Sequence, residues 1–231
     1  LLLNTPYQKY TTVSLYTDSS GYIWAGLYGE GARRINPETN RIQYLNKELR
    51  NGNVLNITGR GYVVWLATLG GGTKIKFSGD QLEVKNYGRQ EGLVSDYIYQ
   101  IFIDSQDRVW FATDGNGAGM LDESGFHHYE KGLPSKVVYG FAEDGNHRIW
   151  LNIQGEGLFQ FDGEAFQSLA KETPLRDKNI NGFSSDTYGN LVILHDLGIE
   201  IYDIEKKKVR YLGDEVGIRD MKPNLNALTR D

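Results

Sequence analysis

The sequence has no cysteine, only five prolines and only two methionines. The missing cysteine excludes disulfide frameworks, thiolate zinc sites and thiol nucleophiles. Long apolar runs are also missing. The longest is the five-residue VVWLA at 63–67, whereas a membrane helix needs roughly 20 such residues. No long stretch shows a clean apolar period of 3.6 residues, so we expect little helix.

Basic residues are outnumbered, with 25 Lys and Arg against 30 Asp and Glu, for a net charge of −5. A nucleic-acid-binding surface would show a basic stripe. The nearest feature is the short run EKKKVR at 205–210, which we interpret as a solvated strand or hairpin edge. We therefore expect no nucleic-acid partner.

The residues that are abundant favour strands. The chain contains 28 glycines, 15 tyrosines and nine phenylalanines. Aromatic and β-branched side chains suit packed, pleated strands, and glycines suit the tight turns between them. The composition therefore predicts an all-β fold.

An internal repeat organises the sequence. Tryptophans recur at intervals of 41, 45 and 40 residues, at Trp24, Trp65, Trp110 and Trp150, and a fifth unit has Val192 at the equivalent place. Six residues before these five anchors stand Asp18, Gly59, Asp104, Asp144 and Asp186. Nine residues before them stand Leu15, Asn56, Ile101, Phe141 and Phe183. Units of this length are typical of repeat folds.

A glycine pair comes after each tryptophan, as in GEG at 29–31, and would suggest a phosphate-binding loop if it occurred once. It occurs in four units at the same offset, and the residues after each pair have the pattern of a strand and not of a helix. We interpret these glycines as positive-φ residues of tight connections between strands.

Each unit divides into four short strands, the first of them innermost. The stretches DSSG and DTYG place Asp and Gly where a type I turn prefers them, and the carboxylate can accept hydrogen bonds from the amides of its own turn. Four carboxylates about 40 residues apart do not form a metal site, so we expect no metal and no cofactor. The indoles are expected to fill the wedge between neighbouring sheets.

Four-stranded units of this kind are propeller blades. We predict five blades, at approximately 11–50, 51–94, 95–134, 135–177 and 178–218. Residues 1–10 are interpreted as the tail of a preceding blade and residues 219–231 as the start of a following one. The sequence opens with LLLNTPYQKY, which has neither Met nor the pattern of a signal peptide. We expect it to be a fragment, an arc of a larger and seven-bladed ring that self-associates when isolated.

The units resemble the two-component regulator propeller repeats. The resemblance is carried by VSLYTDSSGYIWAG, IYQIFIDSQDRVWFAT and VVYGFAEDGNHRIWLN, and it covers nearly the whole chain. The third and fourth units lack the turn glycine, the second lacks the Asp and the fifth lacks the Trp. The resemblance implies the periplasmic sensor region of a Bacteroides-type hybrid two-component histidine kinase. It also implies an oligosaccharide ligand, no catalysis by these residues, and signal relay to downstream β-sandwich and kinase domains that this chain does not contain.

Two other functions remain open. One is a propeller enzyme of the lyase or glycosidase type. A streptogramin lyase, for example, would need a catalytic His near the axis, and His195 is the loop histidine that could serve. The other is a structural propeller that docks protein partners.

Candidate ligand-binding residues are those that differ between blades within loops of one face, because repeated positions hold the scaffold. The loops between second and third strands and the connectors between blades share such a face. Carboxylates, amides and aromatic rings there suit sugar recognition. The candidates are Tyr28, Glu30, Tyr97, Asp114, Asn116, Glu156 and His195. No catalytic residue is predicted.

Overall fold

The structure, a computed structural model, describes residues 11–169, 175–218 and 223. It contains five four-stranded antiparallel sheets and two short 3-10 helices, Arg89–Glu91 and Asp214–Val216. The partial units expected at 1–10 and 219–231 lie outside the described residues, apart from residue 223.

Each sheet is built from four strands that are consecutive in sequence. The first two sheets contain β1 (Thr12–Thr17), β2 (Ile23–Leu27), β3 (Gly31–Ile35), β4 (Ile42–Leu45), β5 (Val54–Arg60), β6 (Val63–Thr68), β7 (Gly71–Ser78) and β8 (Gln81–Tyr87). The third and fourth contain β9 (Ile98–Ile103), β10 (Val109–Thr113), β11 (Ala118–Asp122), β12 (Gly125–Tyr129), β13 (Gly140–Glu143), β14 (Ile149–Ile153), β15 (Gly157–Phe161) and β16 (Phe166–Ser168). The fifth contains β17 (Gly182–Ser185), β18 (Leu191–His195), β19 (Gly198–Asp203) and β20 (Lys208–Leu212).

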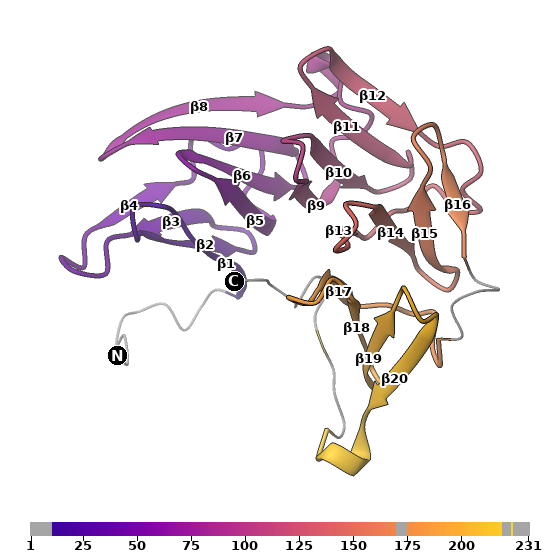
Figure 1. Cartoon of the computed structure of the whole chain (residues 1–231). Coiled ribbons are helices and arrows are strands. Elements are labelled where there is room, and N and C mark those ends of the chain that lie inside the picture. Colours follow the sequence, from indigo (N-terminus) through magenta and orange to yellow (C-terminus); the bar gives the residue numbers. More distant parts are fainter. Residues whose placement is uncertain (1–10, 170–174, 219–222, 224–231) are drawn as a thin grey trace.

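The sheets fan out around a common axis as propeller blades. The first strands of successive sheets, β1, β5, β9, β13 and β17, contact one another and are innermost (Figure 1). The five blades form an open arc, with the first and fifth blades at its two ends (Figure 1). The predicted all-β propeller with about five four-stranded blades is thereby confirmed.

The repeated Asp and Trp belong to one hydrogen-bonded unit. In blade 3 the Asp104 carboxylate accepts the amides of Gln106 and Arg108 at 2.9 and 3.0 Å, and the Trp110 indole N–H at 2.7 Å. Blade 4 repeats these contacts at Asp144 and blade 1 at Asp18. Each carboxylate therefore accepts hydrogen bonds from the amides of its own turn, as predicted, and also from the indole of the same blade.

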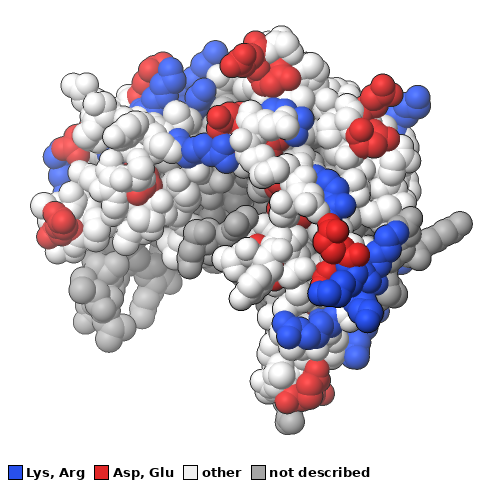
Figure 2. Space-filling view, viewed as in Figure 1, with Lys and Arg blue, Asp and Glu red and all other residues white. Residues whose placement is uncertain are grey.

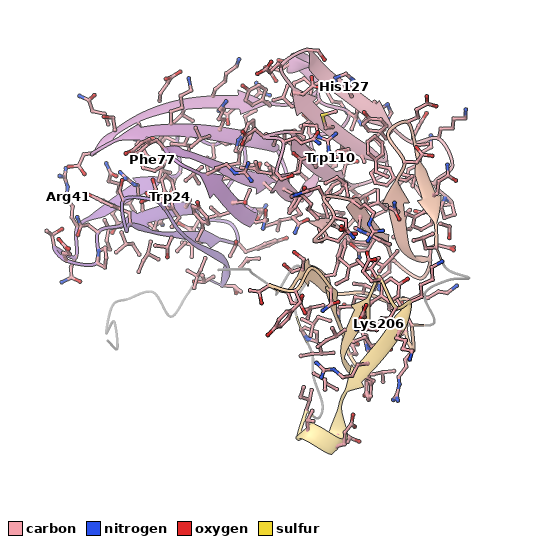
Figure 3. All side chains as sticks on the ribbon, viewed as in Figure 1. Trp24, Arg41, Phe77, Trp110, His127 and Lys206 are labelled. Carbon is pink, nitrogen blue, oxygen red and sulfur yellow. The ribbon has the colours of Figure 1, made fainter. Side chains whose placement is uncertain are left out.

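The indoles lie between blades, where they exclude water. Trp24 packs against Phe77 of blade 2 (Figure 3). Trp110 packs against Phe141 and Phe161 of blade 4. All four tryptophans are buried. Since an aromatic side chain buries a large apolar area, these rings supply much of the packing between neighbouring sheets.

Blade 2 departs from the pattern because its first hairpin is one residue shorter. Ile57 pairs with Leu66, so that Ile57, and not Asn56, is the counterpart of Leu15 and Ile101. Gly59 pairs with Val64 inside the strand and does not occupy the place of the turn Asp. A fixed offset from the tryptophan therefore assigns Asn56 and Gly59 to the wrong positions of the repeat, because it assumes that every blade has a turn of the same length.

Polar side chains on the innermost strands join neighbouring blades. The Ser14 hydroxyl accepts the Ile57 N–H, the Asn56 amide oxygen accepts the Ile101 N–H, and the Gln100 amide oxygen accepts the Phe141 N–H. At the junction of blades 4 and 5 the equivalent residue is Gly140, which has no side chain to form this bridge. Three of the four junctions between described blades therefore carry the bridge.

Candidate functional site

The loops between second and third strands lie beside the connectors between blades. The Gly31 N–H donates to the Gly52 carbonyl at 2.8 Å, and the Gly117 N–H donates to the Lys136 carbonyl at 2.7 Å. The Asp114 N–H likewise donates to the Tyr97 carbonyl at 3.0 Å. We call this side of the arc the connector face. It carries blade-specific residues, whereas the Asp turns occupy the opposite end of each blade.

A cluster of three tyrosines and one aspartate lies where the connector face meets the axis between blades 3 and 4. The rings of Tyr99 and Tyr139 stack with centroids 5.0 Å apart and planes 26° apart. The Tyr99 hydroxyl is hydrogen-bonded to the Asp114 carboxylate. Tyr97 has a 53% exposed side chain two residues before Tyr99. These four residues, Tyr97, Tyr99, Asp114 and Tyr139, form what we call the tyrosine cluster.

The backbone explains why the two stacked rings meet. Tyr99 lies at an irregularity in the pairing of β9 with β10, and the first strands of blades 1 and 2 have similar irregularities. Tyr139 immediately precedes β13 and is the counterpart of Tyr99 in the next blade. Two neighbouring blades thus present the same position side by side, and both positions are tyrosine.

Burial raises the pKa of Tyr99 to about 12, and the nearby negative charge of Asp114 contributes to this rise. The phenol is therefore neutral at physiological pH, and its O–H donates a hydrogen bond to the Asp114 carboxylate. Asp114 is itself exposed, so it keeps acceptor capacity toward solvent or a ligand. The cluster combines a stacked aromatic pair with an oriented carboxylate.

The other predicted residues are spread along the arc. Tyr28 and Glu30 belong to blade 1, where Glu30 lies 3.8 Å from the Arg33 guanidinium. In blade 3 the backbone carbonyl of Asn116 accepts a hydrogen bond from Nε2 of His128. Glu156 is exposed in blade 4. Of the seven candidates, Tyr97 and Asp114 are joined by a hydrogen bond between their backbones.

His195 is a correction. It was predicted as a loop residue of this face, but it is the last residue of β18 and its exposed fraction is 0%. The counterparts of His195 in blades 2 and 3 are Thr68 and Thr113, which close their hairpins by donating to Gly71 and Gly117. His195 pairs with Gly198 just as Thr68 pairs with Gly71, so position 195 is the last paired residue of its strand and lies outside the loop.

Tyr99 and Tyr139 were missed because innermost strands were assigned to the scaffold. A signal for them exists in the sequence, because each stands eleven residues before its tryptophan, in consecutive units. Aligning the units on the tryptophan would have shown two tyrosines at a position that holds other residue types elsewhere.

Comparison with known proteins gives these observations a family context. Residues 92–115, which include the first strand of blade 3 and its turn, match the family described as Two component regulator propeller. The resemblance to that repeat is confirmed. No curated protein matches the sequence.

Solved structures share the fold. The extracellular domain of the hybrid two-component system BT3049 from B. thetaiotaomicron superposes with a TM-score of 0.80 at 21% identity, covering 94% of this chain and 31% of that one. That of BT4673 from the same organism gives a TM-score of 0.55 at 18% identity, covering 93% of this chain and 39% of that one. The chain thus spans about a third of these extracellular domains. Within the described residues, no helix has the length and apolar character needed to cross a membrane.

A lyase shares the fold as well. Virginiamycin B lyase from Staphylococcus aureus, in a catalytically inactive form with quinupristin, superposes with a TM-score of 0.76 at 12% identity, covering 96% of this chain and 75% of that one. At these identities the similarity establishes the propeller fold and not a shared activity. Any function therefore depends on the chemistry of the site.

Proposed function

We propose that this chain is the ligand-recognising propeller segment of an extracytoplasmic two-component sensor, and that the tyrosine cluster contacts an oligosaccharide. The observation that carries the proposal is the stacked pair of Tyr99 and Tyr139, with Asp114 hydrogen-bonded to Tyr99. The family match at residues 92–115 supports the sensor context.

The chemistry of the cluster suits a sugar. The exposed ring of Tyr97 offers a flat apolar surface for the C–H face of a pyranose, and the Asp114 carboxylate accepts hydrogen bonds from hydroxyl groups. The stacked pair spans the junction of blades 3 and 4. A ligand held there would contact two blades at once, and its binding would change the position of blade 3 relative to blade 4. Signal relay to a downstream kinase is part of this proposal.

The segment itself is proposed to be non-enzymatic. The lyase alternative needs an accessible histidine near the axis, and the residue considered for that role, His195, is buried. Tyr99 is held neutral by the rise in its pKa and so would not act as a base near neutral pH. Neither residue supports elimination or hydrolysis.

Calorimetric titration of the 231-residue chain with a panel of neutral oligosaccharides tests the proposal. For any sugar that binds, Tyr97→Ala and Asp114→Ala are each expected to weaken affinity at least tenfold. Tyr188→Ala is the matched control, because Tyr188 is 89% exposed in an Asp turn at the other end of blade 5. Binding that responds equally to Tyr97→Ala and Tyr188→Ala, or cleavage of any sugar in the panel, would overturn the proposal.

A further inference from the structure

A pocket on blade 5 lies away from the tyrosine cluster. It has a volume of about 420 Å³ and is lined by Arg176, Glu200, Lys207, Lys208, Val209 and Tyr211. Small-molecule sites range from roughly 300 to 1,000 Å³, so the pocket is large enough for a ligand. Figure 2 shows Lys and Arg gathered over β19 and β20, the strands that, with the turn between them, carry five of its six residues.

The run EKKKVR, which we interpreted as a solvated hairpin edge, supplies part of this pocket. Lys206 is paired with Asp203 at 2.7 Å, and Glu205 accepts the Asn146 side-chain amide at 2.6 Å. The next two residues, Lys207 and Lys208, border the pocket. Two of the three lysines in the run are therefore placed beside a cavity, which a merely solvated edge does not require.

Arg176 is held in a fixed position at the rim. Its guanidinium lies 3.6 Å from the centroid of the Tyr211 ring, and the Tyr211 hydroxyl donates to the Leu197 carbonyl. The stacked guanidinium keeps its N–H groups available in its plane. No carboxylate among the described residues lies within ion-pairing distance of it. Arg176 is thus a positioned cation with donors to spare.

Glu200 supplies a buried acceptor in the same pocket. Its side chain is 1% exposed, and its carboxylate accepts the Arg176 backbone N–H at 3.0 Å. Behind it, His195 Nε2 lies 3.4 Å from a carboxylate oxygen. Neither ring nitrogen of His195 has a hydrogen-bond partner in the described structure. Buried polar groups are almost always hydrogen-bonded, so this buried pair in a repeat scaffold calls for a functional account.

We propose that the blade 5 pocket binds a sugar acid. Arg176, with Lys207, binds its carboxylate, and the Glu200 carboxylate accepts a neighbouring hydroxyl. Arg176 and Lys207 outnumber the one carboxylate of the lining, which favours an anionic over a neutral ligand. The saccharide part of this inference rests on the proposed function. The anion part rests on the pocket alone.

The test compares two probes that share one sugar backbone and differ in whether their carboxyl groups are charged. The 231-residue chain is titrated calorimetrically with tri-galacturonic acid and with its methyl ester. The parent is expected to bind the acid at least tenfold more tightly than the ester, with an affinity that falls as salt is raised. Arg176→Gln is expected to remove at least nine-tenths of the affinity for the acid. Arg176 is exposed, so its replacement leaves the fold intact, and the melting temperature checks this.

Arg210→Gln is the matched control. Arg210 belongs to the same basic run but pairs with Ile201, on the face of the strand opposite Glu200 and Tyr211. It is expected to change affinity for the acid by less than twofold. Equal binding of acid and ester, equal effects of Arg176→Gln and Arg210→Gln, or no binding of the acid by the parent would each overturn the inference.

Tyr97→Ala separates this inference from the proposed function. It should leave binding of the acid unchanged, because Tyr97 belongs to blade 3 and the pocket to blade 5. If Tyr97→Ala abolishes binding of the acid while Arg176→Gln does not, the tyrosine cluster is the site and the blade 5 pocket is not. If neutral sugars fail to bind but the acid binds through Arg176, the blade 5 pocket is the site and the tyrosine cluster is not.

Discussion

The Trp110 indole N–H donates a hydrogen bond of 2.7 Å to the Asp104 carboxylate six residues earlier. The same buried carboxylate accepts the Arg108 guanidinium at 2.6 Å and two turn amides. Its removal would leave a buried indole donor unpaired. We therefore expect Asp104→Ala to lower the free energy of unfolding by about 3 kcal/mol, measured by urea denaturation.

Asp186→Ala is the comparison, because blade 5 has Val192 in place of the tryptophan. Asp186 still accepts its turn amides and the Asn190 side chain at 2.9 Å, but no indole. The loss should be smaller, roughly 1 kcal/mol. Equal losses at the two positions would show that the indole bond contributes nothing beyond the turn.

Restoring the repeated Asp in blade 2 should destabilise the protein. A Cβ at Gly59 would lie 2.6 Å from the Val63 carbonyl oxygen and 3.0 Å from the Tyr16 ring. Gly59→Asp is therefore expected to lower the melting temperature, even though it makes the unit look more regular. Gly61→Asn is the control, since Gly61 has open space around it and a φ of +56°, which Asn tolerates. A higher melting temperature for Gly59→Asp would contradict the shortened hairpin.

The tyrosine cluster should make stability fall at high pH. Tyr99 has a folded-state pKa of about 12, above the value near 10 of an unfolded tyrosine. Its contribution is therefore fully present below pH 10 and is lost as the pH rises toward 12. Asp114→Asn should lower the pKa of Tyr99 but not return it to 10, because burial remains the larger cause. NMR titration of the Tyr99 ring signals measures both values, and an unchanged pKa in Asp114→Asn would show that the carboxylate has no part.

The isolated chain should self-associate through the ends of the arc. Val192, Ile199 and Ile201 are partly exposed on the side of blade 5 that faces away from blade 4, and Leu15 at the other end is 62% exposed. Exposed apolar sheet faces favour association. Sedimentation should show concentration-dependent species that Ile201→Lys reduces and Val216→Lys does not. A compact monomer at every concentration would contradict this expectation.

The repeat made most of the fold predictable. Asp18, Trp24 and their counterparts recur because each blade needs the same turn and the same filled wedge, and recurrence is visible in one sequence. The short hairpin of blade 2 was not predictable from counting, because Gly59 and Asn56 occupy the expected offsets while the pairing is shifted by one residue. Offsets along a chain carry no information about how many residues a turn uses.

The candidate site was predicted only in part, for a related reason. Tyr97 and Asp114 lie in loops that differ between blades, and such differences are visible when the units are compared in sequence. Tyr99 and Tyr139 lie on or beside the innermost strands, where the apolar pattern of the sequence predicts packing and not ligand contact. His195 was misplaced because strand ends are set by pairing with Gly198, which residue type alone does not reveal.

The glycine at position 140 changes which residues join blades 4 and 5. Blades 1 to 4 are tied in series by Ser14, Asn56 and Gln100, each reaching the backbone of the next blade from an innermost strand. At the last junction the ties come instead from Asn152 in β14, which donates to the Ile180 carbonyl at 3.1 Å, and from Asn146 in the turn before β14, which donates to Glu205. A mechanical signal that passes between blades 4 and 5 would therefore load side chains of β14 and its turn, and not a side chain of the innermost strand as at the other three junctions.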